Sequence, residues 1–206
     1  MLKKIKNNSK IIILILLFAF FILISAIKYS NAVFSDITNS VFRFHVIANS
    51  DSKEDQELKI KVRDSVLEYI NSNAEKIESK QQFIKFATEH QTHLQTIAQN
   101  KVKEEGYSYN VTVEIGNFYF PTKIYNNITL PSGNYDGLEI KIGKAEGRNW
   151  WCVMFPPLCL LDNSTYKMED SSLKLLEQNL SKEEFSIITE NTPTMKFKFK
   201  ILELFN

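Results

Sequence analysis

The chain has 206 residues, of which 44% are hydrophobic and 24% are charged, and this composition excludes an intrinsically disordered protein. Residues 1–32 hold five of the 25 Lys and Arg residues and none of the 24 Asp and Glu residues. The remaining chain therefore has 20 basic and 24 acidic residues, and this net negative charge argues against a nucleic-acid partner.

The N-terminus has the pattern of an export segment. An apolar run over residues 11–27 follows four lysines, Lys3, Lys4, Lys6 and Lys10. As a helix the run spans about 25 Å, which is longer than a usual signal-peptide core but shorter than the ~30 Å hydrocarbon core of a bilayer. Ser30 and Ala32 form a small-x-small pattern that predicts signal-peptidase cleavage after Ala32. A cleaved signal peptide and a retained membrane anchor are both compatible with this pattern, and each places the folded part outside the cytoplasm.

The domain organisation follows from this pattern. We expect residues 1–32 to be a signal peptide or membrane anchor, residues 33–40 a tether, and residues 41–206 a single extracytoplasmic domain.

A first strand is predicted where Phe42, Phe44 and Val46 alternate with Arg43 and His45. Two amphipathic helices are predicted after it. Ser52 followed by Asp55 indicates a capping box and a helix from about Lys53 to residue 71. The second helix carries apolar side chains at helical spacing over residues 83–98 and ends before Gly106.

Short strands dominate the rest of the chain. Val111, Val113 and Ile115 alternate with polar residues, and Gly116-Asn117 predicts a tight hairpin turn. Further strands are predicted at residues 118–120, 138–142, 149–155 and 196–201, and a short helix at residues 171–180. The expected fold class is α+β: a mainly antiparallel sheet with two amphipathic helices packed on one face, preceded by the N-terminal apolar export or anchor helix.

The first candidate site lies where the predicted first strand meets the helix after it. Polar side chains and free N–H groups can converge on a ligand at such a junction. We expect a partner-binding surface with contributions from Arg43, His45, Asn49, Asp51 and Asp55. The alternative is that His45 is a hydrogen-bonded core residue and that Asp51 only caps the helix.

The second candidate site is the aromatic segment Asn149, Trp150 and Trp151. Adjacent residues of a strand point to opposite faces, so one tryptophan is expected at the surface, where Trp is typical of binding hot spots. The alternative is that both rings are covered. Cys152 and Cys159 are the only cysteines, and an exported protein permits a disulfide between them; two buried free thiols are the alternative.

Recognisable catalytic and metal-binding motifs are missing from the sequence. The segment that begins at Asn49 fails as a calcium loop because Glu54 and Ile60 replace the required Gly and Glu. His90 and His93 have no metal-site context, and His90 falls on an apolar stripe. We therefore expect no catalytic residues, metal or cofactor. A rival hypothesis is an envelope hydrolase with His45 as the general base and Asp51 or Asp55 orienting it, and another is a passive structural protein.

Three segments together carry a family resemblance. They read FRFHVIANSDSKEDQELKIKVRDSVLEYI at residues 42–70, FPTKIYNNITLPSGNYDGLEIKIG at 120–143 and RNWWCVMFPPLCLLD at 148–162. These segments resemble the stage II sporulation protein R family. One departure is that the family has closely spaced glycines before the paired tryptophans, whereas Gly143 and Gly147 are more widely spaced here.

The resemblance implies a signal that is made in the forespore and exported into the space between the two sporulation membranes. It also implies that this signal is required to activate a membrane-embedded aspartic protease of the mother cell, which processes the sigma-E precursor. It implies no catalytic residue, and the membrane is a further expected partner, through residues 11–27, if the N-terminal segment is not cleaved.

Overall fold

A computed structural model describes residues 2–74, 77–125, 128–157 and 170–189, in two compact units, Met1–Ile37 and Thr38–Asn206. Helix α1 (Leu2–Ser40) makes up the first unit and extends into the start of the second. Its segment Lys10–Ser40 is long and apolar enough to cross a membrane, a property that signal sequences share. Residues 33–40 are helical within α1, and their role as a tether stays a prediction.

The second unit contains a four-stranded sheet with the order β2-β5-β1-β6. Its strands are β1 (Phe42–Ile47), β2 (Val111–Phe120), β5 (Gly133–Ile142) and β6 (Asn149–Phe155). β1 pairs parallel with β5, whereas β1–β6 and β2–β5 are antiparallel. The predicted α+β class is therefore confirmed, with one parallel pair at the centre of a mainly antiparallel sheet.

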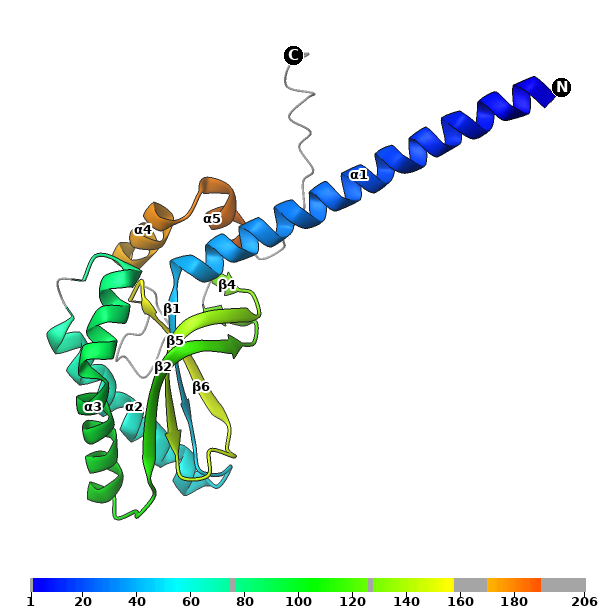
Figure 1. Ribbon diagram of the computed structural model, residues 1–206. Helices are drawn as coiled ribbons and strands as arrows, with labels where there is room; N and C mark the ends of the chain where they lie inside the picture. The colour runs from blue at the N-terminus through cyan, green and yellow to red at the C-terminus, as the bar shows by residue number, and fades with distance from the viewer. Residues whose placement is uncertain (1, 75–76, 126–127, 158–169, 190–206) are drawn as a thin grey trace. The chain divides into compact units, whose positions relative to one another are not determined.

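Helices α2 (Lys53–Asn73) and α3 (Lys80–Glu104) cover one face of this sheet (Figure 1). The alternation along each strand sends its apolar side chains to that face. The core contains Phe44 and Val46 from β1 and Leu138 and Ile140 from β5, packed with helix residues such as Val62, and all five are at most 2% exposed. The opposite face of the sheet, called the outer face below, carries the alternate residues of each strand.

The predicted helix start at Lys53 is confirmed, but the capping box is only half formed. The Asp55 N–H donates to Ser52 Oγ at 3.1 Å, as a capping box requires. The Asp55 carboxylate instead accepts hydrogen bonds from Ser50 and Asn49, because the chain before the helix folds back over it.

The predicted hairpin turn at Gly116-Asn117 is wrong. β2 runs straight through these residues, which pair with Gly137 and Asp136 of β5. The physical reason is that β5 is as long as β2 and offers a partner at every position, so the two turn-forming residues remain extended.

Several small elements complete the fold. β3 (Lys123–Tyr125) pairs with β4 (Ile128–Leu130), and the sequence patterns did not predict this pair. α4 (Asp170–Asn179) matches the expected short helix. α5 (Lys182–Thr189) was not predicted. Ser181 and Glu184 form a full reciprocal capping box at the start of α5, a signal that the sequence does contain. The strand predicted at residues 196–201 lies outside the described residues.

Candidate partner-binding site

The predicted site residues fall into two neighbouring groups around β1. Arg43, His45 and Trp151 lie on the outer face of the sheet, together with Glu139 of β5; these four residues are called the outer-face cluster. The shared face of Arg43 and His45, which strand alternation predicts, is confirmed by their pairing with Val153 and Trp151. The other group lies at the end of β1 and contains Asn49, Asp51 and Asp55.

Arg43 is fully buried in the outer-face cluster. Its Nη2 donates to the Tyr125 hydroxyl at 3.0 Å, and its guanidinium carbon lies 4.4 Å from the ring centre of Phe120 and 4.9 Å from that of Tyr135. These aromatic faces stabilise the cation in place of a carboxylate. Burial raises the pKa of Tyr135 to about 12, so its phenol stays protonated beside the cation.

His45 is hydrogen-bonded to Glu139 through Nε2, and its ring lies 4.6 Å from that of Trp151. Burial lowers the pKa of His45 below its ordinary value, and the neighbouring Glu139 carboxylate only partly opposes this effect. Glu139 also binds Lys141 through its other oxygen at 2.5 Å. The alternative of a hydrogen-bonded, buried His45 is therefore what the structure shows.

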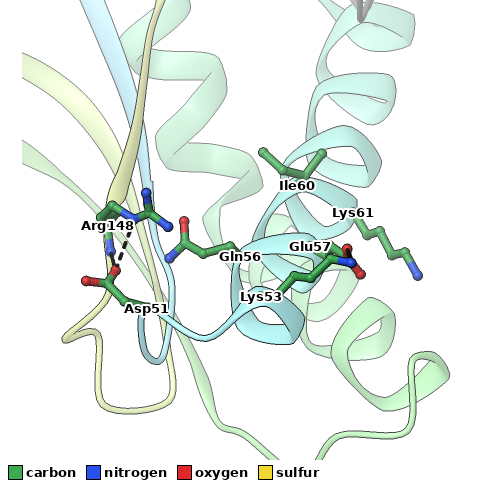
Figure 2. Close-up of a pocket in the computed structure, with 7 residues that line it drawn as sticks. All are labelled: Asp51, Lys53, Gln56, Glu57, Ile60, Lys61 and Arg148. Carbon is green, nitrogen blue, oxygen red and sulfur yellow. Dashed lines mark hydrogen bonds and ion pairs between the residues drawn. The ribbon is translucent and has the colours of Figure 1, made fainter.

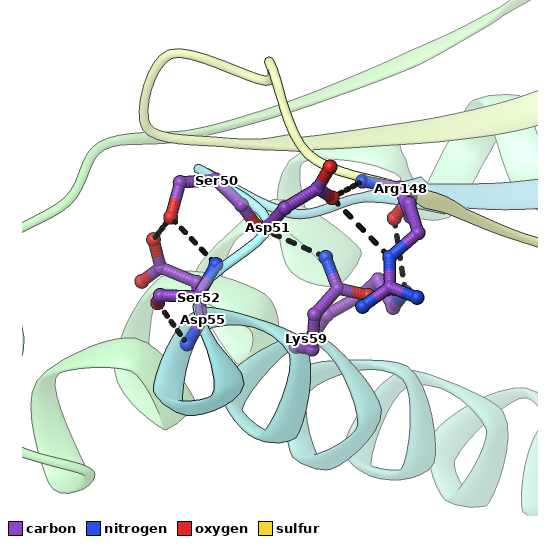
Figure 3. A network of polar contacts seen from close by, with 7 residues as sticks. Ser50, Asp51, Ser52, Asp55, Lys59 and Arg148 are labelled. Atoms are coloured by element: carbon purple, nitrogen blue, oxygen red, sulfur yellow. Dashed lines mark hydrogen bonds and ion pairs between the residues drawn. The ribbon is translucent and has the colours of Figure 1, made fainter.

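The polar group at the end of β1 is organised around Asp55 (Figure 3). Its carboxylate accepts hydrogen bonds from Ser50 Oγ at 2.5 Å and from Asn49 Nδ2 at 2.8 Å. Burial by itself raises the pKa of Asp55, but hydrogen bonds from Ser50, Asn49 and Tyr109 outweigh burial and hold the pKa below its ordinary value. Asp55 is thus a buried structural carboxylate.

Asp51 connects this group to the loop between β5 and β6. Its Oδ1 accepts the Arg148 N–H at 2.7 Å and lies 3.4 Å from Arg148 Nε. The alternative interpretation, in which Asp51 caps α2, is therefore wrong, because Ser52 occupies the N-cap position. The loop is held further by Gly147 N–H, which donates to Ala48 O at 3.0 Å.

Lys59 lies beneath this junction and is 5% exposed. Its ammonium donates to Gln56 Oε1 at 2.6 Å and to the Arg148 carbonyl at 2.9 Å. Burial lowers the pKa of Lys59, and the positive charges of Arg148 and Arg63 lower it further. An open pocket lies beside these residues, lined by Asp51, Lys53, Gln56, Glu57, Lys61 and Arg148, with Ile60 contributing an apolar wall (Figure 2). We call it the α2 pocket.

The two tryptophans point to opposite faces, as predicted. Trp151 pairs with His45 and lies on the outer face of the sheet. Trp150 is half-buried on the helix side, where its ring centre lies 5.7 Å from the ring centre of Phe44 and 4.7 Å from the guanidinium carbon of Arg63. Asn149 is exposed at the start of β6. Cys159 lies outside the described residues, so its disulfide with Cys152 stays a prediction.

The rival hydrolase hypothesis requires a carboxylate from Asp51 or Asp55 at His45. The structure places Glu139 there instead, and Asp51 and Asp55 are engaged by Arg148, Ser50 and Asn49. Sequence reasoning did not place Glu139, Lys59 or Arg148 beside β1, because nothing in their local sequence indicates that the fold brings them there. Strand alternation around Glu139 could have placed it on the polar face of its strand.

Elsewhere, His90 accepts or donates a 2.5 Å hydrogen bond with Tyr69 and is half-buried. Within the described ranges of the chain, no three metal-ligating side chains gather into a group.

Comparison with known proteins identifies the family. The family model for stage II sporulation protein R matches residues 38–165. Stage II sporulation protein R of Bacillus subtilis (strain 168) is 37% identical over 128 residues, which cover 62% of this chain and 57% of that relative. No solved structure matches the chain significantly. The match includes β1, β5 and β6, the three strands that carry the outer-face cluster, and the chain belongs to the stage II sporulation protein R family.

Proposed function

We propose that this protein is a sporulation signal exported from the forespore into the intermembrane space. There it is required to activate the membrane-embedded aspartic protease of the mother cell, which processes the sigma-E precursor. The observation that carries the proposal is membership of the stage II sporulation protein R family directly after an apolar export or anchor helix. The protein then acts outside the cytoplasm, either secreted or held by residues 11–27.

The proposed mechanism needs binding and no catalysis. A ligand shifts the equilibrium between two states of a protein only by its difference in affinity for them. The domain therefore activates the protease by binding its active state more tightly than its inactive state. The outer-face cluster and the polar group at the end of β1 supply side chains that packing and hydrogen bonds already hold in place. This order reduces the conformational entropy lost on binding.

Not every predicted partner-binding residue can make direct contact. Arg43 is fully buried and Asp55 is 5% exposed, so in the proposal both act by positioning their neighbours. The exposed Asn149 and Asp51 and the half-buried Asn49, Trp150 and Trp151 are the predicted residues with surface to offer a partner.

The test is sigma-E precursor processing in sporulating cells, scored by immunoblot. Cells without this protein are complemented with the wild type, with His45→Gln, or with Trp151→Ala, and each variant is checked for wild-type abundance. We expect processing to stop without the protein, to return with the wild type and with His45→Gln, and to weaken with Trp151→Ala.

Normal processing without the protein would refute the signalling role. Loss of processing with a stable, folded His45→Gln variant would instead favour catalysis by the imidazole.

A further inference from the structure

The ammonium of Lys59 is buried without a carboxylate. Both of its acceptors, Gln56 Oε1 and the Arg148 carbonyl, are neutral, and no Asp or Glu oxygen pairs with it within the described part of the chain. Lysine is seldom buried this deeply unless an anion pairs with it, because the charge loses its hydration. The buried charge is therefore only partly compensated, by two neutral acceptors and by the more distant Asp51.

The surrounding charges make this position more positive. Arg148 and Arg63 both repel the Lys59 ammonium, and Asp51 is the one acid whose attraction opposes them. Asp51 is already hydrogen-bonded to the Arg148 backbone. An added carboxylate here would be attracted by Lys59 and Arg148, and the burial of Lys59 strengthens its share of that attraction.

The α2 pocket lies beside Lys59, and its lining has three cations, Lys53, Lys61 and Arg148, against two acids, Asp51 and Glu57. Figure 2 shows the Arg148 guanidinium directed toward Gln56, with Ile60 farther along the same wall. The side chain of Arg148 is 73% exposed, and its Nε lies 3.4 Å from Asp51 Oδ1, which leaves most of the guanidinium open to solvent. Ile60 supplies an apolar part of the lining.

We infer that the α2 pocket binds an acidic side chain, Asp or Glu, in a segment of a protein partner. Arg148 makes the direct ion pair, and Lys59 strengthens it from beneath while holding the Arg148 backbone and Gln56 in place. This inference rests on the proposed function in one respect: the acidic segment belongs to the protease, on the side of the membrane that faces this domain.

The test measures binding of a synthetic peptide to the full chain in detergent micelles, by fluorescence anisotropy. The probes are labelled (Glu-Gly)4 and its neutral counterpart (Gln-Gly)4. We expect the acidic peptide to bind at least about fivefold more tightly, and its affinity to fall as ionic strength rises from about 0.05 to 0.3 M. Arg148→Gln and Lys59→Met should each weaken acidic-peptide binding about threefold or more. Lys85→Gln, at an exposed lysine of α3, should not.

Equal affinity for the two peptides, or no effect of Arg148→Gln, would overturn the inference. Arg148 is exposed, so its replacement preserves the fold even if Lys59→Met unfolds the domain. Competition by inorganic phosphate as strong as that by the acidic peptide would show a small-anion site instead and would also overturn it.

A second assay separates this inference from the proposed function. If Arg148→Glu restores sigma-E processing fully and the peptide does not bind, the inference fails while the signalling role stands. If the protein is dispensable for processing but the acidic peptide binds through Arg148, the signalling role fails while the pocket stands.

Discussion

Gly147 is the position where a single added methyl group should damage the candidate site most. A Cβ at Gly147 would lie 2.2 Å from Ser50 O and 2.5 Å from Ser50 C, whereas ordinary contact begins near 3.4 Å. Both obstructing atoms belong to the backbone, so no side-chain rotation relieves the overlap. The loop would have to retreat by about 1 Å, away from the end of β1.

The cost of Gly147→Ala has two parts. Overpacking of this kind costs about 1–3 kcal/mol, and the retreat weakens the hydrogen bond from Gly147 N–H to Ala48 O, which contributes about 1 kcal/mol. We expect the free energy of unfolding to fall by about 2–4 kcal/mol in total. The same retreat pulls Arg148 from Asp51, so the variant should also weaken sigma-E processing.

Two other glycines serve as matched controls in urea unfolding of the full chain, followed by circular dichroism. Gly106 has a φ of +84° but nothing within 4 Å of an added Cβ, so Gly106→Ala should cost only backbone strain, about 1–2 kcal/mol. Gly116 is in a strand with ordinary contact to Phe118, so Gly116→Ala should be neutral or slightly stabilising. The reasoning is refuted if Gly147→Ala costs no more than Gly106→Ala.

Three further predictions concern side chains that hold the domain together. Burial lowers the pKa of His45 in the folded protein below its ordinary value of 6.5. As the pH falls, the unfolded chain therefore binds a proton at this histidine before the folded protein does. The free energy of unfolding should then be complete above pH 6.5 and should fall as the pH drops toward the folded-state pKa. His45→Gln should flatten the pH dependence of the urea midpoint between about pH 7.5 and 5.5, and an unchanged slope would contradict this. Gln99→Ala should lower the free energy of unfolding in urea by about 1–2 kcal/mol. At the edge of β2, the Gln99 side chain accepts a hydrogen bond from the outward N–H of Val111 and donates one to the carbonyl of Tyr109. The control Gln95→Ala, at an exposed glutamine of the same helix, should be near neutral. Lys80→Met should raise the pKa of Asp136, measured by a carboxyl NMR titration. Burial favours the neutral acid, and the hydrogen bond from Lys80 holds the pKa of Asp136 low in the wild type. An unchanged pKa of Asp136 in the variant would rule out Lys80 as the cause.

Segments predicted correctly from the sequence have a structure set by neighbouring residues, and the wrongly predicted turn depends on a distant partner. Strand alternation placed Arg43 and His45 on one face and the two tryptophans on opposite faces, because the period of a strand is set by the backbone alone. The start of α2 was predictable from Ser52 for a similar reason, since an N-cap bond spans only three residues. The turn at Gly116-Asn117 failed because a long-range partner, β5, kept the local turn signal extended.

The sequence by itself determined the N-terminal apolar helix, the two amphipathic helices, the alternating strands and the family, since each depends on local periodicity or on the order of residues along the chain. Only the tertiary structure decided that β1 lies between β5 and β6, with β5 parallel to it. That arrangement brings Glu139 to His45 across 94 positions of sequence and Arg148 to Asp51 across 97. Such partners cannot be predicted from local patterns, because their contact depends on how the whole sheet is assembled.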